Sequence, residues 1–398
     1  MPNLSQKGLS MPESPIRKLV PYATDAKRRG IHVYHLNIGQ PDIPTPEHVL
    51  EAVRKNDIRV LSYSQSEGSP GHREKISRYY AEHGLDIRPE EIIITTGGSE
   101  ALSFAFACIT DPGDEIIIPE PFYANYNGFA RANGTRIVPV TSHIEDGFAL
   151  PPTGEIEKKI GRHTKALLIC NPGNPTGYLY TREELEQIRD LVLRYDLYVI
   201  ADEVYREFVY DGAEHVSIMS FPELKDHAIL VDSVSKRYSM CGARIGYFVS
   251  KNRELMATAL KFAQARLSPP SYAQIAAEAA LDTPAAYFEE VNAEYKKRRD
   301  VLVNELQKIP DITVSSPKGA FYCIAGLPVA DADDFAKWML KDFEYHGKTV
   351  MVAPAAGFYA SEGLGKNQVR IAYVLETPAL IEAVEILKQG LSQYRKSR

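Results

Sequence analysis

The sequence is poor in cysteine and has no long hydrophobic run. Its four cysteines lie far apart, without the spacing of a metal site: Cys108, Cys170, Cys241 and Cys323. We therefore expect buried free thiols in a protein of the reducing cytoplasm. No stretch approaches the roughly 18 apolar residues of a membrane helix, and the polar segment from Met1 to Ser10 lacks the apolar core of a signal peptide. Because the histidines form no His-Glu-x-x-His pair, we predict no bound metal.

Basic residues are fewer than acidic ones, 46 against 52, so the formal net charge is −6. We therefore expect neither nucleic acid nor an anionic membrane as a partner. No internal repeat or low-complexity segment occurs. A length of 398 residues, with 44% hydrophobic and 25% charged residues, is typical of a globular protein with two closely associated domains.

From about residue 46 the chain alternates helical patterns with short, β-branched apolar runs. This alternation predicts a mostly parallel sheet with helices on both faces. The expected strands are residues 91–95, 115–119, 136–140, 166–170, 197–201, 228–232 and 245–249. Between them, Thr181 and Glu184 form a capping box at the start of a helix over residues 181–195.

The pattern changes after about residue 284. A long charged helix is expected over residues 287–307, followed by strands at 321–325, 349–352 and 369–374. We therefore predict a large domain over residues 46–283 and a smaller α+β domain made of residues 1–45 and 284–398.

Polar side chains follow three of the expected strands. Lys236 comes just after residues 228–232, Asp202 ends the run before it, and Asn174 lies in the motif Asn-Pro-Gly-Asn-Pro-Thr-Gly. Each one alone is typical of a surface cation or a turn. Together with the phenol of Tyr205, they supply what pyridoxal phosphate needs: an amine for its aldehyde, an acid for its ring nitrogen and donors for its ring oxygen.

An anion site is predicted at Thr-Thr-Gly-Gly-Ser-Glu, residues 95–100. A strand ends there and an apolar helix starts near Ser99, so free backbone N–H groups and the helix dipole favour a phosphate. Gly97 and Gly98 allow close approach of the backbone. An ordinary strand-to-helix turn is the alternative.

In this order the motifs resemble the class I/II aminotransferases of fold type I, most like the aspartate and aromatic aminotransferases, from about Leu36 to about Val374. The resemblance implies an α/β fold with a mostly parallel seven-stranded sheet and a smaller α+β domain. It also implies that backbone groups of Gly98, Ser99 and Glu100 hold the cofactor phosphate. By the same resemblance, Ser233, Ser235 and Arg244 complete the phosphate site.

The resemblance assigns catalytic roles to Lys236, Asp202 and Tyr205. It implies that Lys236 holds the cofactor as an aldimine and moves the substrate proton, that Asp202 keeps the ring nitrogen protonated, and that Asn174 and Tyr205 donate to the ring oxygen. Tyr123 matches the aromatic residue that stacks on the ring. Phe122 is its rival, and a core tyrosine is the alternative.

Substrate binding is assigned in the same way. Arg370 and Gly39 match the groups that bind the α-carboxylate, together with Asn174. Tyr63 matches a tyrosine that reaches the phosphate of a neighbouring subunit, which implies a homodimer with shared active sites. The sequence departs from the family at His72, where leucine is usual, and we expect only a packing change there.

The implied function is ping-pong transamination of an L-amino acid, with aspartate as first choice and 2-oxoglutarate as acceptor. Arg266 lies where dicarboxylate-specific relatives carry a side-chain-binding arginine, but a helix-surface arginine fits it equally. Aromatic or broad specificity is the runner-up, and a carbon–sulfur β-lyase on the same fold is a further alternative. A nucleotide-binding dehydrogenase is excluded because no Gly-x-Gly-x-x-Gly turn follows Gly97. An aminotransferase-like sensor of a transcription regulator is disfavoured, because the short N-terminal extension has no room for a helix-turn-helix module.

Overall fold

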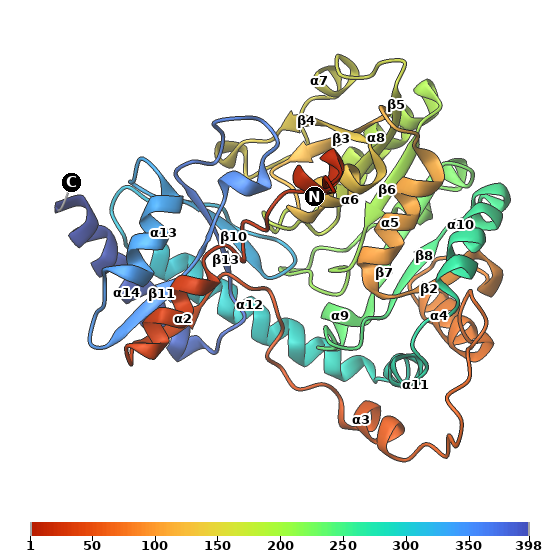
Figure 1. Ribbon diagram of the computed structural model, residues 1–398, viewed down its shortest axis with the longest axis horizontal. Helices are drawn as coiled ribbons and strands as arrows, with labels where there is room; N and C mark the ends of the chain where they lie inside the picture. Colours follow the sequence, from red (N-terminus) through yellow and green to blue (C-terminus); the bar gives the residue numbers. More distant parts are fainter. Residues whose placement is uncertain (1, 397–398) are drawn as a thin grey trace.

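The predicted apolar runs form a seven-stranded sheet at the centre of the larger of two lobes in the computed structural model, which describes residues 2–396 (Figure 1). Its order is β2 (Ile92–Thr95), β8 (Gly246–Val249), β7 (Ala228–Ser233), β6 (Tyr198–Asp202), β5 (Thr164–Cys170), β3 (Glu115–Glu120) and β4 (Arg136–Thr141). Only β8 runs antiparallel to its neighbours. All seven predicted strands are confirmed, with ends shifted by at most two residues, and so is the α/β fold.

Every strand of this sheet except the edge strand β4 is buried on both faces. Ile93 packs into a cluster with helices α5 (Gly97–Ile109), α6 (Asn125–Asn133) and α10 (Arg253–Arg266), whereas Ile92 and Ile94 pack into a second cluster on the opposite face. That second cluster holds side chains of α4 (Pro70–Glu82), α8 (Arg182–Tyr195) and α11 (Ser271–Ala280), and α3 (Glu47–Arg54) lies against α11. The period of two residues along a strand explains this division. The capping box of Thr181 and Glu184 starts α8 as predicted.

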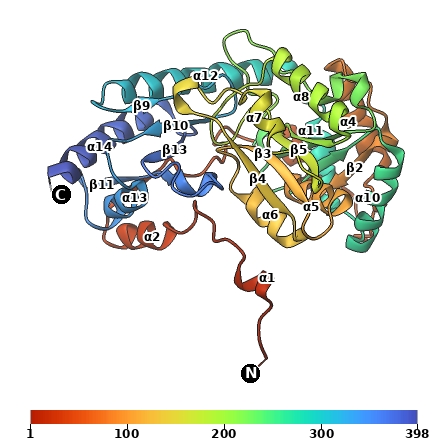
Figure 2. The ribbon, with the colours of Figure 1, turned by 90° about the horizontal axis from the view of Figure 1, so that it is seen from above.

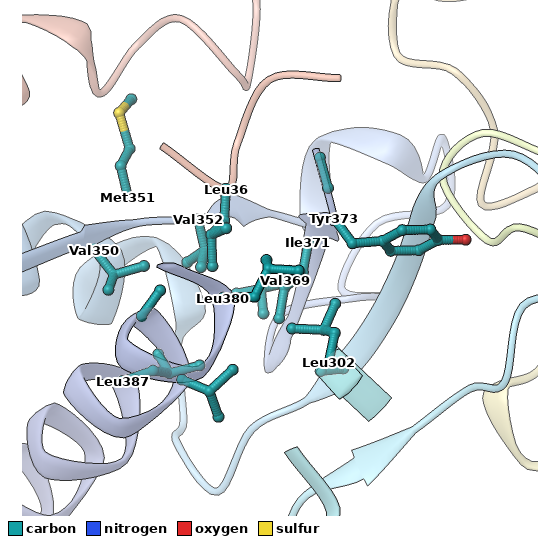
Figure 3. Close-up of a cluster of buried hydrophobic side chains, with 14 of the residues drawn as sticks. Leu36, Leu302, Val350, Met351, Val352, Val369, Ile371, Tyr373, Leu380 and Leu387 are labelled. Carbon is teal, nitrogen blue, oxygen red and sulfur yellow. The ribbon is translucent and has the colours of Figure 1, made fainter. Parts of the chain in front are cut away.

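The smaller lobe has two sheets. One is antiparallel, with the order β12 (Ala353–Pro354), β13 (Gln368–Ala372), β10 (Tyr322–Gly326) and β9 (Thr313–Val314). The other pairs β1 (His32–His35) with β11 (Lys348–Met351) in parallel. Helices α2 (Val20–Arg28), α13 (Ala332–Lys341) and α14 (Thr377–Lys396) cover them. Leu36, Val369, Ile371 and Leu387 meet in their shared apolar core (Figure 3).

Two segments connect the lobes. Helix α12 (Ala285–Gln307) spans both (Figure 2): the Phe288 ring lies 5.6 Å from that of Tyr238 in the large lobe, while Leu302 is buried in the core of the smaller one. The N-terminal segment is divided between them. β1 belongs to the smaller lobe, but α1 (Gln6–Leu9) lies near α6, where Lys7 Nζ donates to the carbonyl of Ala132 at 3.2 Å.

All four cysteines are free, but the prediction that they are buried is wrong for three of them. Only Cys323 is buried, inside β10. Cys108, Cys170 and Cys241 are half-buried, because they lie at or near the ends of helices and strands. No helix within residues 2–396 is both long and apolar enough to cross a membrane.

Candidate active site

The predicted phosphate-binding segments meet around the first residue of β8. Gly246 pairs with Thr95 at the end of β2 and with Ser233 at the end of β7. A Cβ on Gly246 would overlap with the backbone of Gly97 and Gly98. The antiparallel β8 therefore brings the 95–98 turn and the end of β7 into direct contact.

This junction has the donors that an anion requires. Helix α5 begins at Gly97, and its N-cap Thr96 makes no side-chain capping bond, so the first-turn amides remain available. Gly97 has a φ of +75°, and a Cβ there would overlap with the guanidinium of Arg244. The hydroxyls of Ser233 and Ser235 lie 2.7 Å apart in the same region. A guanidinium, two hydroxyls and a helix N-terminus suit a phosphate dianion.

The carboxylate of Glu100 is bound at the start of α5. Its Oε2 accepts from the backbone N–H of Thr96 at 2.7 Å and lies 3.3 Å from Nη1 of Arg266. Arg266 also donates to the carbonyls of Ser66 at 2.9 Å and Ile94 at 3.2 Å. The geometry therefore favours a structural role for Arg266, whose guanidinium joins the start of α5 to the 62–69 segment.

Asp202 lies at the end of β6 and is 4% exposed. The Tyr126 hydroxyl donates to its Oδ2 at 2.7 Å. Burial raises the pKa of the Asp202 carboxyl to about 6, although the bond from Tyr126 opposes the shift. A buried carboxylate that is costly to ionise fits the protonated ring nitrogen of pyridoxal phosphate, because a nearby cation stabilises the charged form.

Lys236 lies in the short helix α9 (Val234–Arg237), directly after β7. Its Nζ donates to the carbonyl of Gly39 at 2.9 Å and lies 3.5 Å from Sγ of Cys241. The hydroxyl of Tyr205, three residues after Asp202, is 2.8 Å from that of Tyr322. The amine predicted to serve the cofactor thus contacts Gly39, and the phenol contacts Tyr322, whose hydroxyl lies beside Gly39.

Arg370, on β13, is 2% exposed. It donates to Oδ1 of Asn174 at 2.9 Å and to the carbonyl of Asn37 at 2.6 Å. Its Cζ lies 4.5 Å from the ring centre of Tyr322 and 4.9 Å from that of Phe358. Within residues 2–396, its Nε has no hydrogen-bond partner. A buried guanidinium with an unused N–H is suited to a carboxylate.

Tyr123 lies beside Tyr126, with the two ring centres 5.5 Å apart. Burial raises the pKa of its phenol to about 12. Its rival Phe122 is 3% exposed and packs into the core beneath α6.

Tyr63 is the one predicted residue that a single chain does not bring to the site. It is 78% exposed, in the loop between α3 and α4. Its proposed contact with a neighbouring subunit stays a prediction.

Sequence analysis missed several groups of the site. Tyr126 follows Tyr123 by three residues, and that spacing was an available signal. Tyr322 carries no signal, because it is one aromatic residue within a buried strand. The carbonyl of Asn37 and the thiol of Cys241 contribute through positions that only the folded chain defines.

Known proteins resemble this chain over nearly all of its length. A family model described as aminotransferase class I and II matches residues 31–387. An aspartate aminotransferase of Geobacillus stearothermophilus is 32% identical over 96% of this chain and 97% of its own length. Two solved structures, each covering 98% of this chain and 100% of their own, have a TM-score of 0.89: aspartate aminotransferase from Thermus thermophilus with maleate, at 31% identity, and alanine aminotransferase from Pyrococcus furiosus, at 33%.

The sequence match, the shared fold and the donor set at the ends of β6 and β7 agree with one another. The chain belongs to the class I and II aminotransferases and is a pyridoxal-phosphate-dependent enzyme.

Proposed function

We propose that this aminotransferase moves the amino group of an L-amino acid, with aspartate as first choice, to 2-oxoglutarate in two half-reactions. The observation that carries the proposal is the loop of residues 37–39. Its Asn37 carbonyl accepts from Arg370, and its Gly39 carbonyl accepts from Lys236. The proposed carboxylate-binding cation and the reactive amine therefore both donate to carbonyls of one short segment, which fits the binding of an amino acid through its carboxylate near the amine.

Each side chain of the site has a separate role in the proposed reaction. Pyridoxal phosphate, when bound, supplies a sink for the electrons of the substrate Cα–H bond. Lys236 Nζ takes the Cα proton and returns it, acting as base and then acid. Asp202 holds a proton at the ring nitrogen, while Tyr205 and Asn174 donate to the ring oxygen. Arg370 orients the substrate through its carboxylate.

Further parts of the proposal concern binding and assembly. Arg244, Ser233, Ser235 and the backbone of Gly98 and Ser99 hold the cofactor phosphate, and the side chain of Tyr123 covers its ring. The exposure of Tyr63 supports a homodimer in which each chain completes the other's site.

We propose that residues 46–283 form the cofactor-binding domain, and that residues 1–45 and 284–398 form a smaller domain that closes over the substrate. The pairing of β1 with β11 supports this division for residues 32–35, whereas α1 lies against α6 of the large lobe. Four free thiols support a reducing, cytoplasmic location.

The choice of aspartate rests on the relatives named as aspartate aminotransferases. Arg266 no longer supports it, because its guanidinium is engaged by Glu100 and two carbonyls. Aromatic donors remain the second candidate.

The test is the visible spectrum of the purified protein with pyridoxal phosphate, before and after L-aspartate is added without any oxo acid. We expect a yellow band that fades. A band that ignores aspartate but fades with tyrosine or phenylalanine would change the substrate and keep the reaction. Pyruvate and ammonia released without an acceptor would point to a lyase instead.

Lys236→Ala should abolish turnover while cofactor affinity is partly kept. Replacing a remote lysine, as in Lys251→Ala, should leave turnover and the band intact. Full activity of the Lys236→Ala variant would overturn the proposed mechanism.

A further inference from the structure

Tyr322 occupies the centre of the candidate site, although nothing in the sequence singles it out. It lies on β10 and is 2% exposed. Its hydroxyl is 2.8 Å from that of Tyr205, and its ring lies 4.5 Å from Cζ of Arg370. The same hydroxyl fills the space beside Gly39, where a Cβ would overlap with it. The Tyr322 side chain therefore contacts both Tyr205, the predicted donor to the cofactor, and Arg370, the predicted site for the substrate carboxylate.

The hydrogen bond between the two hydroxyls needs one donor and one acceptor. Each hydroxyl carries one proton, and only one of them can donate across the shared 2.8 Å bond. Tyr205 can donate its own proton to another acceptor only when Tyr322 is the donor in that bond. Within residues 2–396, the hydroxyl of Tyr322 has only Tyr205 as a hydrogen-bond partner, so its proton has no competing acceptor there.

We propose that Tyr322 is a positioning residue with two separable actions, an inference that rests on the proposed function. Its hydroxyl donates to Tyr205 and so directs the Tyr205 proton toward the ring oxygen of the bound cofactor. Its ring packs over the guanidinium of Arg370 and fixes the orientation in which that cation meets the substrate carboxylate. Tyr322 would thus affect both the hydrogen bond to the cofactor ring oxygen and the orientation of the cation that binds the substrate carboxylate.

The hydroxyl action is tested by the pH dependence of the visible band of the holoenzyme, which reports how strongly protein donors stabilise a negative ring oxygen. Tyr322→Phe removes the hydroxyl and keeps the ring. A hydroxyl that accepts a hydrogen bond donates its own proton more strongly, so Tyr205 should donate less well without Tyr322, and we expect the pH midpoint of the band to rise by about half a pH unit to one unit. Tyr373→Phe is the matched control, since that buried hydroxyl donates to the carbonyl of Ala320 and is not bonded to Tyr205, and it should leave the midpoint unchanged.

A double-mutant cycle separates positioning from general structural damage. If Tyr322 acts through Tyr205, then Tyr205→Phe and the double variant Tyr205→Phe/Tyr322→Phe should have the same midpoint. Additive shifts, or a wild-type midpoint in the Tyr322→Phe variant, would overturn the hydroxyl action. A wild-type protein without any visible band would overturn the proposed function itself, so the two failures are distinguishable.

The ring action is tested by substrate kinetics. Tyr322→Phe keeps a ring over Arg370 and should leave the KM for the amino acid within about twofold of the wild type. Tyr322→Leu removes the ring and should raise that KM about threefold or more. Equal KM values in both variants, with thermal unfolding showing both folded, would overturn the ring action. If the leucine variant does not fold, a raised KM in Tyr322→Phe would overturn it.

Discussion

The clearest stability prediction concerns the ion pair next to Lys236, the lysine proposed to hold the cofactor. Asp232 on β7 and Arg237 at the end of α9 are both fully buried, and Nη2 of Arg237 lies 2.7 Å and 2.6 Å from the two carboxylate oxygens. Tyr80 also donates to Asp232 at 3.0 Å. Burial alone would lower the pKa of Arg237, but the carboxylate of Asp232 raises it well above its usual value. The pair closes the turn that carries Lys236.

The substitution Arg237→Leu should cost about 3–5 kcal/mol of unfolding free energy, because it leaves the Asp232 carboxylate buried without its cation. Lost packing adds to this, since the guanidinium lies 4.2 Å from the ring centre of Tyr79. Making the carboxylate neutral as well, in Asp232→Asn/Arg237→Leu, should restore part of the loss, because the fully buried carboxylate at position 232 is then absent.

The assay is urea unfolding followed by circular dichroism at one fixed protein concentration, so that assembly does not change the comparison. Arg253→Leu, at an exposed arginine on the large lobe, is the control and should change stability by less than about 0.5 kcal/mol. A loss below about 1 kcal/mol for Arg237→Leu would refute the reasoning. A double variant no more stable than the single one would refute the role assigned to the unpaired carboxylate.

Three further predictions follow from the site. Arg266→Leu should lower the thermal midpoint but leave the ratio of kcat/KM for aspartate and tyrosine within about twofold, because its guanidinium is engaged by backbone carbonyls; a strong selective loss with aspartate would restore its role in specificity. Gly39→Ala should raise the amino-acid KM about tenfold or more, because a methyl group there overlaps with the Tyr322 hydroxyl; unchanged steady-state kinetics would contradict this. The pKa of Asp202 is raised to about 6 in the folded chain, so the folded, cofactor-free protein holds this proton to a higher pH than the unfolded chain does. The free energy of unfolding should therefore fall by up to about 3 kcal/mol as the pH rises from about 4 to about 6. Asp202→Asn should therefore be more stable than the cofactor-free wild type at pH 7 and no more stable at pH 4, as measured by denaturant unfolding; equal stability at both pH values would contradict the assigned pKa.

Much of the larger lobe was predictable because its strands are buried on both faces. Such strands are short, continuous apolar runs, and the polar residue that ends each run is conspicuous in the sequence. Asp202 and Lys236 were found in this way. The antiparallel direction of β8 and the division of the N-terminal segment between the lobes were not predictable, since both depend on contacts between distant residues.

The sequence by itself determined the fold class, the order of the strands along the chain and the chemical set of amine, carboxylate, amide and guanidinium. Local periodicity and the order of motifs carry that information. Only the tertiary structure decided which groups meet. In the folded chain Arg266 forms an ion pair with Glu100, and Tyr126 donates to Asp202. Tyr322 contacts both Tyr205 and Arg370. The physical reason is that one buried tyrosine among 23 has no distinguishing local pattern, so its role arises from packing between a strand of one lobe and the strand ends of the other.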